Sequence, residues 1–495
     1  MTRYSCVFPL FAVIAMGCGG TLKATTDSET DPSIDETGSD GTTDAASDPT
    51  EDGDEDPSDE PTDDPTVDGG CTPAEVRCTL DMNSLETCQS DGTWIAEECD
   101  LGCSNEPDAH CMEWDISNIP DDTLISEGRD PTDPAWPSEE YYWVDLDTDT
   151  GGVDVYRTSD WGHVLEVRPG IGEGLHMGSG IHFEIVAQGE GHPELGVFTF
   201  RQLTIPSNYT FGVWGSRSLV LLSELDATID GGVYAGCIWS TEPLGGASNA
   251  GAGAGAGGDA RRTSASGGYR DGGGGGGAFG GAGGMGGGDS AIRGTAGAAY
   301  GTDEIIPLLG GSGGGDGGGV GAGRHGGRSG GAVMIVSGGT LTVSSTGWID
   351  AGGCGGLGAE SNEGGGGGGS GGGILLEAPT VVIAGTVTAN GGAGAGGGGS
   401  SGATDGEDAW FGSDTVAAGG PAAGTYDCAG GNGSGGGTDA GQNAPGCTTG
   451  TYNFGGGGGA AGKVRVNGTS VDMTGSLFSP SMSTPSATQG PLNAS

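Results

Sequence analysis

The segment 372–392 reads GGILLEAPTVVIAGTVTANGG, and it repeats the pattern of segment 331–353, GAVMIVSGGTLTVSSTGWIDAGG. Each copy holds short β-branched and aliphatic runs between glycines, which is the composition of strands joined by turns. The matched positions are Ile335, Val336, Leu341, Val343, Gly347, Ile349 and Ala351 in the earlier copy and Leu375, Leu376, Val381, Ile383, Gly385, Val387 and Ala389 in the later one. Strand islands that recur with matching apolar positions are typical of stacked solenoid rungs, because no island can bury a face alone. The sequence therefore predicts an all-β fold of solenoid-like strand rungs.

Two further copies extend this series. Segment 462–479 is a weaker copy, in which Val464, Val466, Val471, Met473 and Leu477 take similar positions, and segment 218–232 is a degenerate copy that opens the series. The alternation of apolar and polar residues places one set of side chains on one face, where successive rungs would share a core. The copies are irregularly spaced, so long insertions must leave the stack between rungs.

Those insertions are glycine tracts, and the chain contains 115 glycines in 495 residues. Collagen is excluded because the tracts hold few prolines and keep no strict period of three. Glycine helices of the polyproline type have three residues per turn, and without Cβ atoms they can pack closely enough to pair amides with neighbouring carbonyls. Ordered polyglycine helices are one prediction for these loops, with Phe279, Tyr300, Trp410 and Phe454 as anchors on the stack, and mobile loops are the alternative.

The charge balance excludes one class of partner. With 67 acidic against 16 basic residues, the formal net charge is −51. Nucleic acid is not an expected partner, because phosphate binding depends on clustered Lys and Arg.

The beginning of the chain has the features of an export signal. Residues 1–17 hold an early charge and an apolar run too short to span a bilayer, and they lead to Ala-Met-Gly-Cys ending at Cys18. We expect Cys18 to be lipidated, which would make the membrane a partner through a lipid anchor, at the outer membrane and facing the cell surface; a simple secreted protein is the alternative. Residues 18–70 are rich in Asp, Pro and Thr and predict a disordered acidic tether, with calcium binding along it as the alternative.

The cysteines predict disulfides. Six of them lie within residues 71–111, as is typical of a small exported module without a large core, and a zinc site is disfavoured because no CxxC pair is present. The spacing leaves their connectivity open. Farther along, Cys428 with Cys447 would close a polar loop, and Cys237 with Cys354 would form the remaining pair. The cysteines expected in disulfides are Cys71, Cys78, Cys88, Cys99, Cys103, Cys111, Cys428, Cys447, Cys237 and Cys354.

Residues 112–244 have ordinary composition and predict an all-β domain of short strands. Within it, Asp145, Asp147 and Asp149 alternate ahead of glycines, as in calcium-binding loops, although the spacing departs from the EF-hand pattern. A calcium site is one interpretation, and a hairpin with exposed carboxylates is the other. Four histidines between residues 163 and 192 follow no zinc motif and are expected to be exposed.

Residues 245–478 form the glycine-rich β-repeat region, and residues 479–495 are expected to be a disordered tail. Apparent nucleophile motifs in this half, such as GGSGG at residues 310–314, arise from glycine content, because no helix follows them.

The order of these parts resembles the glycine-rich surface lipoproteins of myxobacteria and related bacteria. The features that carry the resemblance are the lipobox at Cys18, the acidic tether, the six-cysteine module with DGTW and CDLGC, and the repeats among glycine tracts. The tracts also resemble those of polyglycine-helix adhesin domains and of a receptor-kinase glycine-rich extracellular region. The resemblance implies a cell-surface location and a β fold, without any catalytic residue.

The sequence therefore predicts a non-enzymatic surface lipoprotein with an adhesive or structural role. Polysaccharide or a matrix protein is the expected partner, with calcium as the only candidate cofactor. Two alternatives remain: a polysaccharide lyase or hydrolase built on a β-helix with paired carboxylates, and a disordered glycine-rich matrix component.

Overall fold

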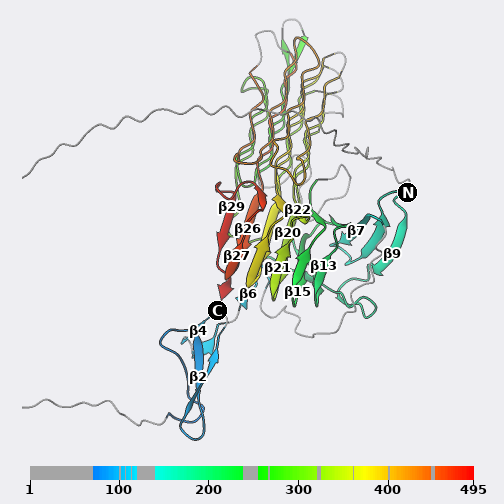
Figure 1. The fold of residues 1–495 in the computed structure, drawn as a ribbon. Helices are drawn as coiled ribbons and strands as arrows, with labels where there is room; N and C mark the ends of the chain where they lie inside the picture. Colours follow the sequence, from blue (N-terminus) through cyan, green and yellow to red (C-terminus); the bar gives the residue numbers. More distant parts are fainter. Residues whose placement is uncertain are drawn as a thin grey trace, which may run out of the picture. The chain divides into compact units, whose positions relative to one another are not determined.

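The computed structural model describes residues 71–99, 102–105, 108–112, 114–119, 140–237, 255–265, 268–319, 325–359, 362–399, 402–446 and 452–494. Within these ranges the protein is all-β and contains no helix (Figure 1). The predicted signal peptide, Cys18 and the acidic tether lie outside the described residues.

Three extended sheets form the main part of the structure. Sheet 1 runs in the order β10 (Gly174–Leu175), β11 (His182–Val186), β12 (Leu195–Phe200), β15 (Ser218–Ser223), β20 (Ala332–Ser337), β23 (Gly373–Glu377), β26 (Lys463–Asn467) and β29 (Ala487–Gly490). Sheet 2 consists of β13 (Leu203–Ile205), β16 (Ala227–Ile229), β21 (Thr340–Val343), β24 (Thr380–Ile383) and β27 (Ser470–Asp472). Sheet 3 consists of β28 (Leu477–Ser479), β25 (Thr386–Thr388), β22 (Trp348–Asp350), β17 (Gly232–Tyr234), β14 (Tyr209–Trp214), β7 (Tyr142–Asp147), β8 (Val153–Arg157) and β9 (His163–Arg168).

Successive strands visit the three sheets in turn. The triplets β12–β13–β14, β15–β16–β17, β20–β21–β22, β23–β24–β25 and β26–β27–β28 each give one strand to every sheet, and equivalent strands of successive triplets pair in parallel. The repeat read from the sequence is this triplet: Leu341 pairs with Val381, Val343 with Ile383, and Ile349 with Val387. Segment 218–232 forms a triplet as expected, whereas the triplet at 195–214 was not identified as a copy.

The core lies between the three sheets. It combines inward-facing residues such as Leu376 from sheet 1, Val381 from sheet 2 and Val387 from sheet 3, all fully buried. The sequence indicated a boundary at residue 244 between an all-β domain and a repeat region, but strands from both sides of this position contribute to the one core. At about 25 cal/mol per Å² of apolar area, such continuous burial is the main stabilising contribution to the stacked strands.

The register predicted for the first strand of the repeat is wrong by one residue. The structure pairs Ile335 with Leu376 and Met334 with Leu375, not Ile335 with Leu375. Both faces of sheet 1 are buried here, because Met334 and Leu375 pack in a second cluster with Leu308 on the face away from the core. A strand that is apolar on both faces has no alternation, so its sequence does not fix its register.

The C-terminal segment 479–495, expected to be a disordered tail, contains two strands. Strand β29 continues sheet 1 and pairs Ala487 with Val464, while β30 (Asn493–Ala494) pairs with β6 (Trp114–Asp115). Their composition is polar, but an open sheet edge supplies backbone partners whatever the side chains are. Pairing with a preformed edge therefore orders a segment that could not fold alone.

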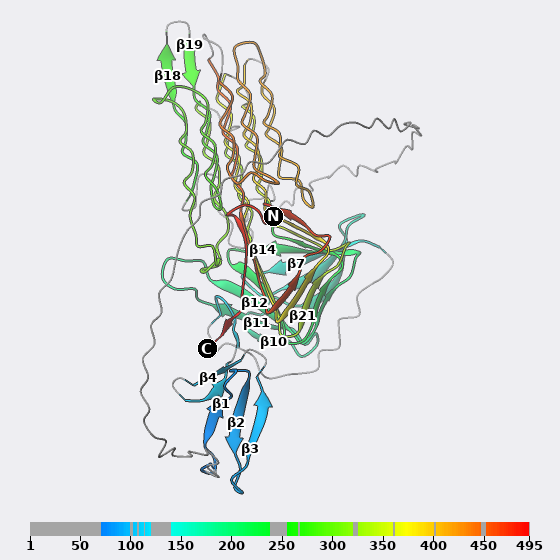
Figure 2. The ribbon, with the colours of Figure 1, turned by 60° about the vertical axis from the view of Figure 1, so that its left-hand side comes forward.

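The glycine tracts are extended threads that run side by side beyond the ends of the strands (Figures 1 and 2). The central thread, residues 272–278, donates backbone hydrogen bonds with a period of three residues to three neighbouring threads. Gly273 and Gly276 donate to Gly287 and Gly284, Gly274 and Gly277 to Gly365 and Gly368, and Gly275 and Ala278 to Gly258 and Gly255. Three further threads donate to its carbonyls, from Gly294 and Gly297, from Gly315 and Gly318, and from Gly457 and Ala460. The central thread thus has six hydrogen-bonded neighbours.

Most positions of the central thread admit only glycine, and Ala278, at the end of the thread, is the exception. A Cβ at Gly273 would lie 1.8 Å from the carbonyl oxygen of Gly455, and a Cβ at Gly275 would lie 1.8 Å from that of Thr295. Both obstacles are backbone atoms, so no side chain can move to relieve the overlap. We call the threads between residues 255 and 462 the glycine bundle.

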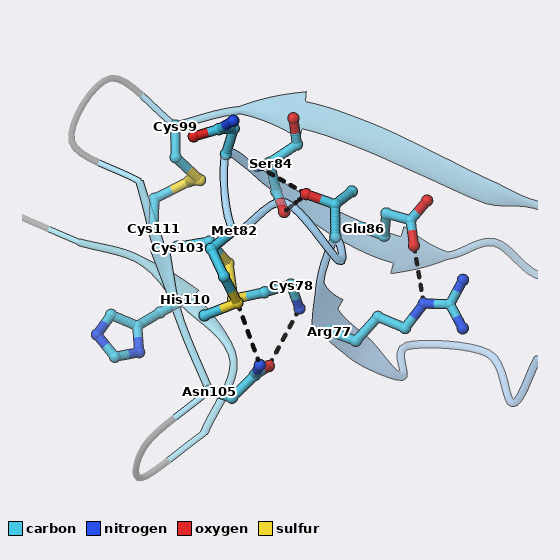
Figure 3. The surroundings of a disulfide bond; sticks show 12 residues. Arg77, Cys78, Met82, Ser84, Glu86, Cys99, Cys103, Asn105, His110 and Cys111 are labelled. Carbon is cyan, nitrogen blue, oxygen red and sulfur yellow. Dashed lines mark hydrogen bonds and ion pairs between the residues drawn. A yellow bond between two sulfur atoms is a disulfide. The ribbon is translucent and has the colours of Figure 1, made fainter. Parts of the chain in front are cut away.

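The six-cysteine module folds around its sulfur atoms. Strands β1 (Val76–Cys78), β2 (Ser84–Cys88) and β3 (Trp94–Glu98) form an antiparallel sheet, and β4 (Cys103–Ser104) pairs with β5 (His110–Cys111). The disulfides are Cys71–Cys88, Cys78–Cys103 and Cys99–Cys111. Figure 3 shows two of them together, near the ion pair of Arg77 with Glu86 that joins β1 to β2. The disulfides replace the apolar core that so small a module lacks.

Candidate functional site: an aromatic row on sheet 3

The three aspartates proposed as calcium ligands lie at the β7–β8 hairpin, and each has different partners. Asp145 Oδ1 accepts hydrogen bonds from the indoles of Trp143 and Trp214, at 2.6 and 2.5 Å. Asp147 accepts the backbone N–H groups of the following turn. Asp149 is paired with Arg217, at 2.9 Å. The ligand atoms of the three do not form one of the convergent groups found among the described residues, and calcium binding stays a prediction.

The one convergent group of metal-ligating side chains in the described ranges is Cys237, Cys354 and Asp408. It does not provide thiolates, because Cys237 and Cys354 are joined as a disulfide. Cys428 is also disulfide-bonded, while its proposed partner Cys447 lies outside the described residues. Among the histidines, His163 contacts Asp154 and His176 contacts Ser179, so these two have separate partners.

A row of aromatic rings crosses the outer face of sheet 3. Its members are Trp161, Trp143, Tyr234, Trp348 and Phe411. The centroids of successive rings are 6.2, 5.8, 6.3 and 5.5 Å apart. Trp161 and Phe411, at its two ends, are 50% and 63% exposed, and the three inner rings are partly exposed. We call these five residues the aromatic row.

Strand geometry explains why the rings gather there. On β7 the side chains alternate, so Tyr142, Val144 and Leu146 face the core and Trp143 and Asp145 face outward. On the neighbouring triplets, Tyr234 and Trp348 occupy outward positions in the same way, next to buried Val233 and Ile349. Phe411 comes from a glycine-rich loop and extends the row beyond the strands.

Two glycines of sheet 3 lie under the indoles. A Cβ at Gly212 would lie 2.1 Å from Trp143 Cζ2, and a Cβ at Gly232 would lie 2.1 Å from Trp348 Cζ2. Each indole therefore covers the backbone of a neighbouring strand, an aromatic–glycine pairing known to fix the position of rings in sheets. Asp145 restrains Trp143 further through its hydrogen bond.

Carboxyl groups accompany the rings. Burial raises the pKa of Asp145 to about 6, although its two indole donors act in the opposite direction. Burial also raises the pKa of Asp350 to about 6, against the hydrogen bonds from Thr388 Oγ1 and the Gly352 N–H group. The row thus combines ring surfaces with carboxyl groups that serve as hydrogen-bond acceptors.

Sequence reasoning missed this row, because its members lie far apart in the chain, between residues 143 and 411. The available signal was a large aromatic at an outward position of a predicted strand, as in YYWVDLD and STGWID. Of the four aromatics expected to anchor the glycine loops, Phe279 and Phe454 are buried and Tyr300 is partly buried against Phe279, whereas Trp410 is exposed.

These features define a disulfide-bonded all-β protein, and the disulfides indicate an extracellular or exported location. No protein-family model matches the chain, and neither a curated protein nor a solved structure matches it. Within the described ranges, no helix has the length and apolar character needed to cross a membrane.

Proposed function

We propose that the protein is an exported lipoprotein, attached to the outer membrane through Cys18, that displays a non-catalytic binding face outside the cell. The observation that carries this function is the aromatic row, because exposed rings gathered on one face of an exported protein are typical of interaction sites. The acidic tether would hold that face away from the membrane.

We further propose that the strand triplets form a three-sided β-solenoid and that the glycine bundle consists of polyglycine helices. Parallel in-register pairing of successive triplets around one core supports the solenoid. The three-residue hydrogen-bond period supports helices with three residues per turn. Both elements would give the binding face a rigid support.

One observation favours an alternative function as an enzyme. Asp145 and Asp154 lie directly opposite each other on β7 and β8, and glycosidases act with a pair of carboxyl groups. Against catalysis, Asp154 contacts His163 and Asp145 is held by two indoles. Release of sugar ends from polysaccharides by the wild type, and its loss in Asp145→Asn, would establish the enzyme.

The test of the binding function uses the purified full-length chain, fluorescently labelled, with producing cells and their extracellular matrix. We expect saturable binding that decreases in a Trp348→Ala variant. A Tyr426→Ala variant is the control, since Tyr426 is 64% exposed and lies outside the row. Absence of binding by the folded wild type would refute the adhesive function and favour a structural coat protein.

A further inference from the structure

We propose that residues 114–119 form a releasable latch, which detaches under load while the strand triplets stay folded. We call these six residues the strap. They follow the six-cysteine module after two residues, and their apolar side chains pack on sheet 1. The role of the strap under load rests on the proposed membrane anchor and binding face.

The strap connects segments that are far apart in the chain. Its strand β6 pairs with β30, where Asp115 lies opposite Asn493. Ser117 donates two hydrogen bonds to Glu377 of β23, from its backbone N–H group at 3.0 Å and from its Oγ at 2.6 Å. Asn467 of β26 donates to the same carboxyl group, and Asn493 donates to Ser117 Oγ. One buried carboxyl group therefore holds the strap, and β30 through it, on sheet 1.

Apolar contacts of the strap are few compared with those of the triplets. Ile116 and Ile119 are 8% and 6% exposed and belong to the cluster of Met334 and Leu375, on the face of sheet 1 away from the core. Each triplet, by contrast, gives a strand to all three sheets around the continuous core. Local opening costs less free energy where fewer buried apolar contacts are lost, so the strap should open before the triplets.

The docked strap also carries costs that its release would remove. The indole nitrogen of Trp114 and the Oδ1 atom of Asn118 are buried without a hydrogen-bond partner. Such atoms are destabilising, because water would bond to them if they were exposed. Asn118 also has a left-handed backbone, with a φ of 64°, which residues other than glycine seldom adopt. Two unpaired polar atoms and one positive φ within six residues indicate a segment that is poised to detach.

The place of the strap in the chain exposes it to tension first. Between Cys18 and the sheets, the chain passes through the six-cysteine module, whose three disulfides are covalent and limit its extension. The strap comes next, ahead of β7, which is the first strand of sheet 3 along the chain. A pull between the anchor and a ligand on sheet 3 would therefore reach the strap before β7. Its release would lengthen the connection without disturbing the aromatic row.

The first test is native-state hydrogen exchange of the full-length chain. We expect the amides of the strap and of β30 to exchange as one unit, at least roughly tenfold faster than those of β20 and β23. Ser117→Ala removes the Oγ atom that bonds Glu377 and Asn493, and it should speed exchange of this unit roughly tenfold without an effect on β20. Ser434→Ala is the matched control, since Ser434 is a buried serine of the glycine bundle that accepts the Gly391 N–H group.

The second test applies force with optical tweezers. One handle is attached to Cys18 of the unlipidated chain, and the other to an azide-bearing residue in place of Leu225, which is exposed in the wild type. We expect a reversible first step before the triplets unfold, of at most about 10 nm, the extended length of the residues from 114 to β7. Ser117→Ala should lower the force of this step, and Ser434→Ala should not.

Three results would overturn the proposal: strap amides protected as strongly as those of β20, no step before the triplets unfold, or equal effects of Ser117→Ala and its control. These measurements use no ligand, so their outcome is independent of binding to cells or matrix. If cells bind the protein and the strap does not open locally, only the latch is wrong. If the strap opens and nothing binds, the latch stands and the binding function is wrong.

Discussion

The strand triplets and the glycine bundle are stabilised in opposite ways. In the triplets, side chains such as Leu376 and Val381 fill the space between three sheets. In the bundle there are almost no side chains to bury, and the threads meet backbone to backbone, with amides and carbonyls paired among six neighbours. The triplets are therefore stabilised by buried apolar area, and the bundle by the close approach of neighbouring backbones.

The difference shows what each region tolerates. A core position accepts another apolar side chain of similar size, since patterning and volume matter most. Positions such as Gly273 and Gly275 in the centre of the bundle accept no Cβ atom, because the nearest obstacle is a carbonyl oxygen. The bundle thus accepts fewer substitutions than the core, although its composition is of low complexity.

The largest effect is expected for Gly275→Val. The new side chain would overlap the carbonyl of Thr295 and push threads apart, with the loss of several hydrogen bonds of about 1 kcal/mol each. We expect destabilisation by more than about 5 kcal/mol within the bundle, measured as lost hydrogen-exchange protection of its amides. The strands of sheet 1 should keep theirs.

Gly437→Ala is the control for this variant, because no atom lies within 4 Å of a Cβ at that position. Its exchange pattern should equal that of the wild type. If Gly275→Val also keeps full protection, the backbone packing described for the bundle is wrong.

The next effect is expected for Leu376→Ala in the core. Loss of a fully buried leucine side chain leaves a cavity and costs about 4 kcal/mol. Denaturant unfolding followed by circular dichroism should show the decrease, whereas Leu225→Ala, at a position 48% exposed, should change stability by less than about 0.5 kcal/mol. Equal effects of the two variants would show that Leu376 is not in the core.

The Cys237–Cys354 disulfide tests how the two regions are linked, since it joins a residue after β17 to one in the glycine-rich segment after β22. The cross-link spans a separation of 117 residues and restricts the unfolded chain. Replacement of both cysteines by alanine should lower the free energy of unfolding by about 3 kcal/mol. Replacement of Cys71 and Cys88, which are paired in the six-cysteine module, should leave the exchange protection of the sheets unchanged.

The smallest effect is expected in the pH dependence of folding stability, through Asp145 at the aromatic row. The folded pKa of Asp145 is raised to about 6 from an ordinary value near 4, so the folded state binds the proton more tightly. Its contribution to stability is present below about pH 4 and is lost as the pH rises through about 6. Asp145→Asn keeps an oxygen for both indoles and should therefore gain stability relative to the wild type between these values.

Urea midpoints of the two proteins at a series of pH values check this prediction. The difference between them should grow from pH 4 to about pH 6 and then stay constant. A constant difference throughout would mean that Asp145 has an ordinary pKa.

The fold was predictable in outline because its repeat is visible as matched islands, and Leu341 with Val381 lies in the register that the sequence indicated. The first strand of the repeat was misaligned because Ile335 and Met334 are both buried, on opposite faces. The ordered strands β29 and β30 were missed for another reason. Their order comes from the edges of β26 and β6, which no local composition reveals.

The sequence by itself determined the strand islands, the disulfide-rich module and the need for glycine, because each depends on local spacing or residue type. Only the tertiary structure decided which threads hydrogen-bond to the central one and which rings form the aromatic row. Some of those neighbours are far apart in the chain: Gly457 donates to Gly274, and the ring of Tyr234 contacts that of Trp348 because β17 pairs in parallel with β22. Periodicity records the face on which a side chain lies, but it does not record which distant strand supplies the neighbouring side chain.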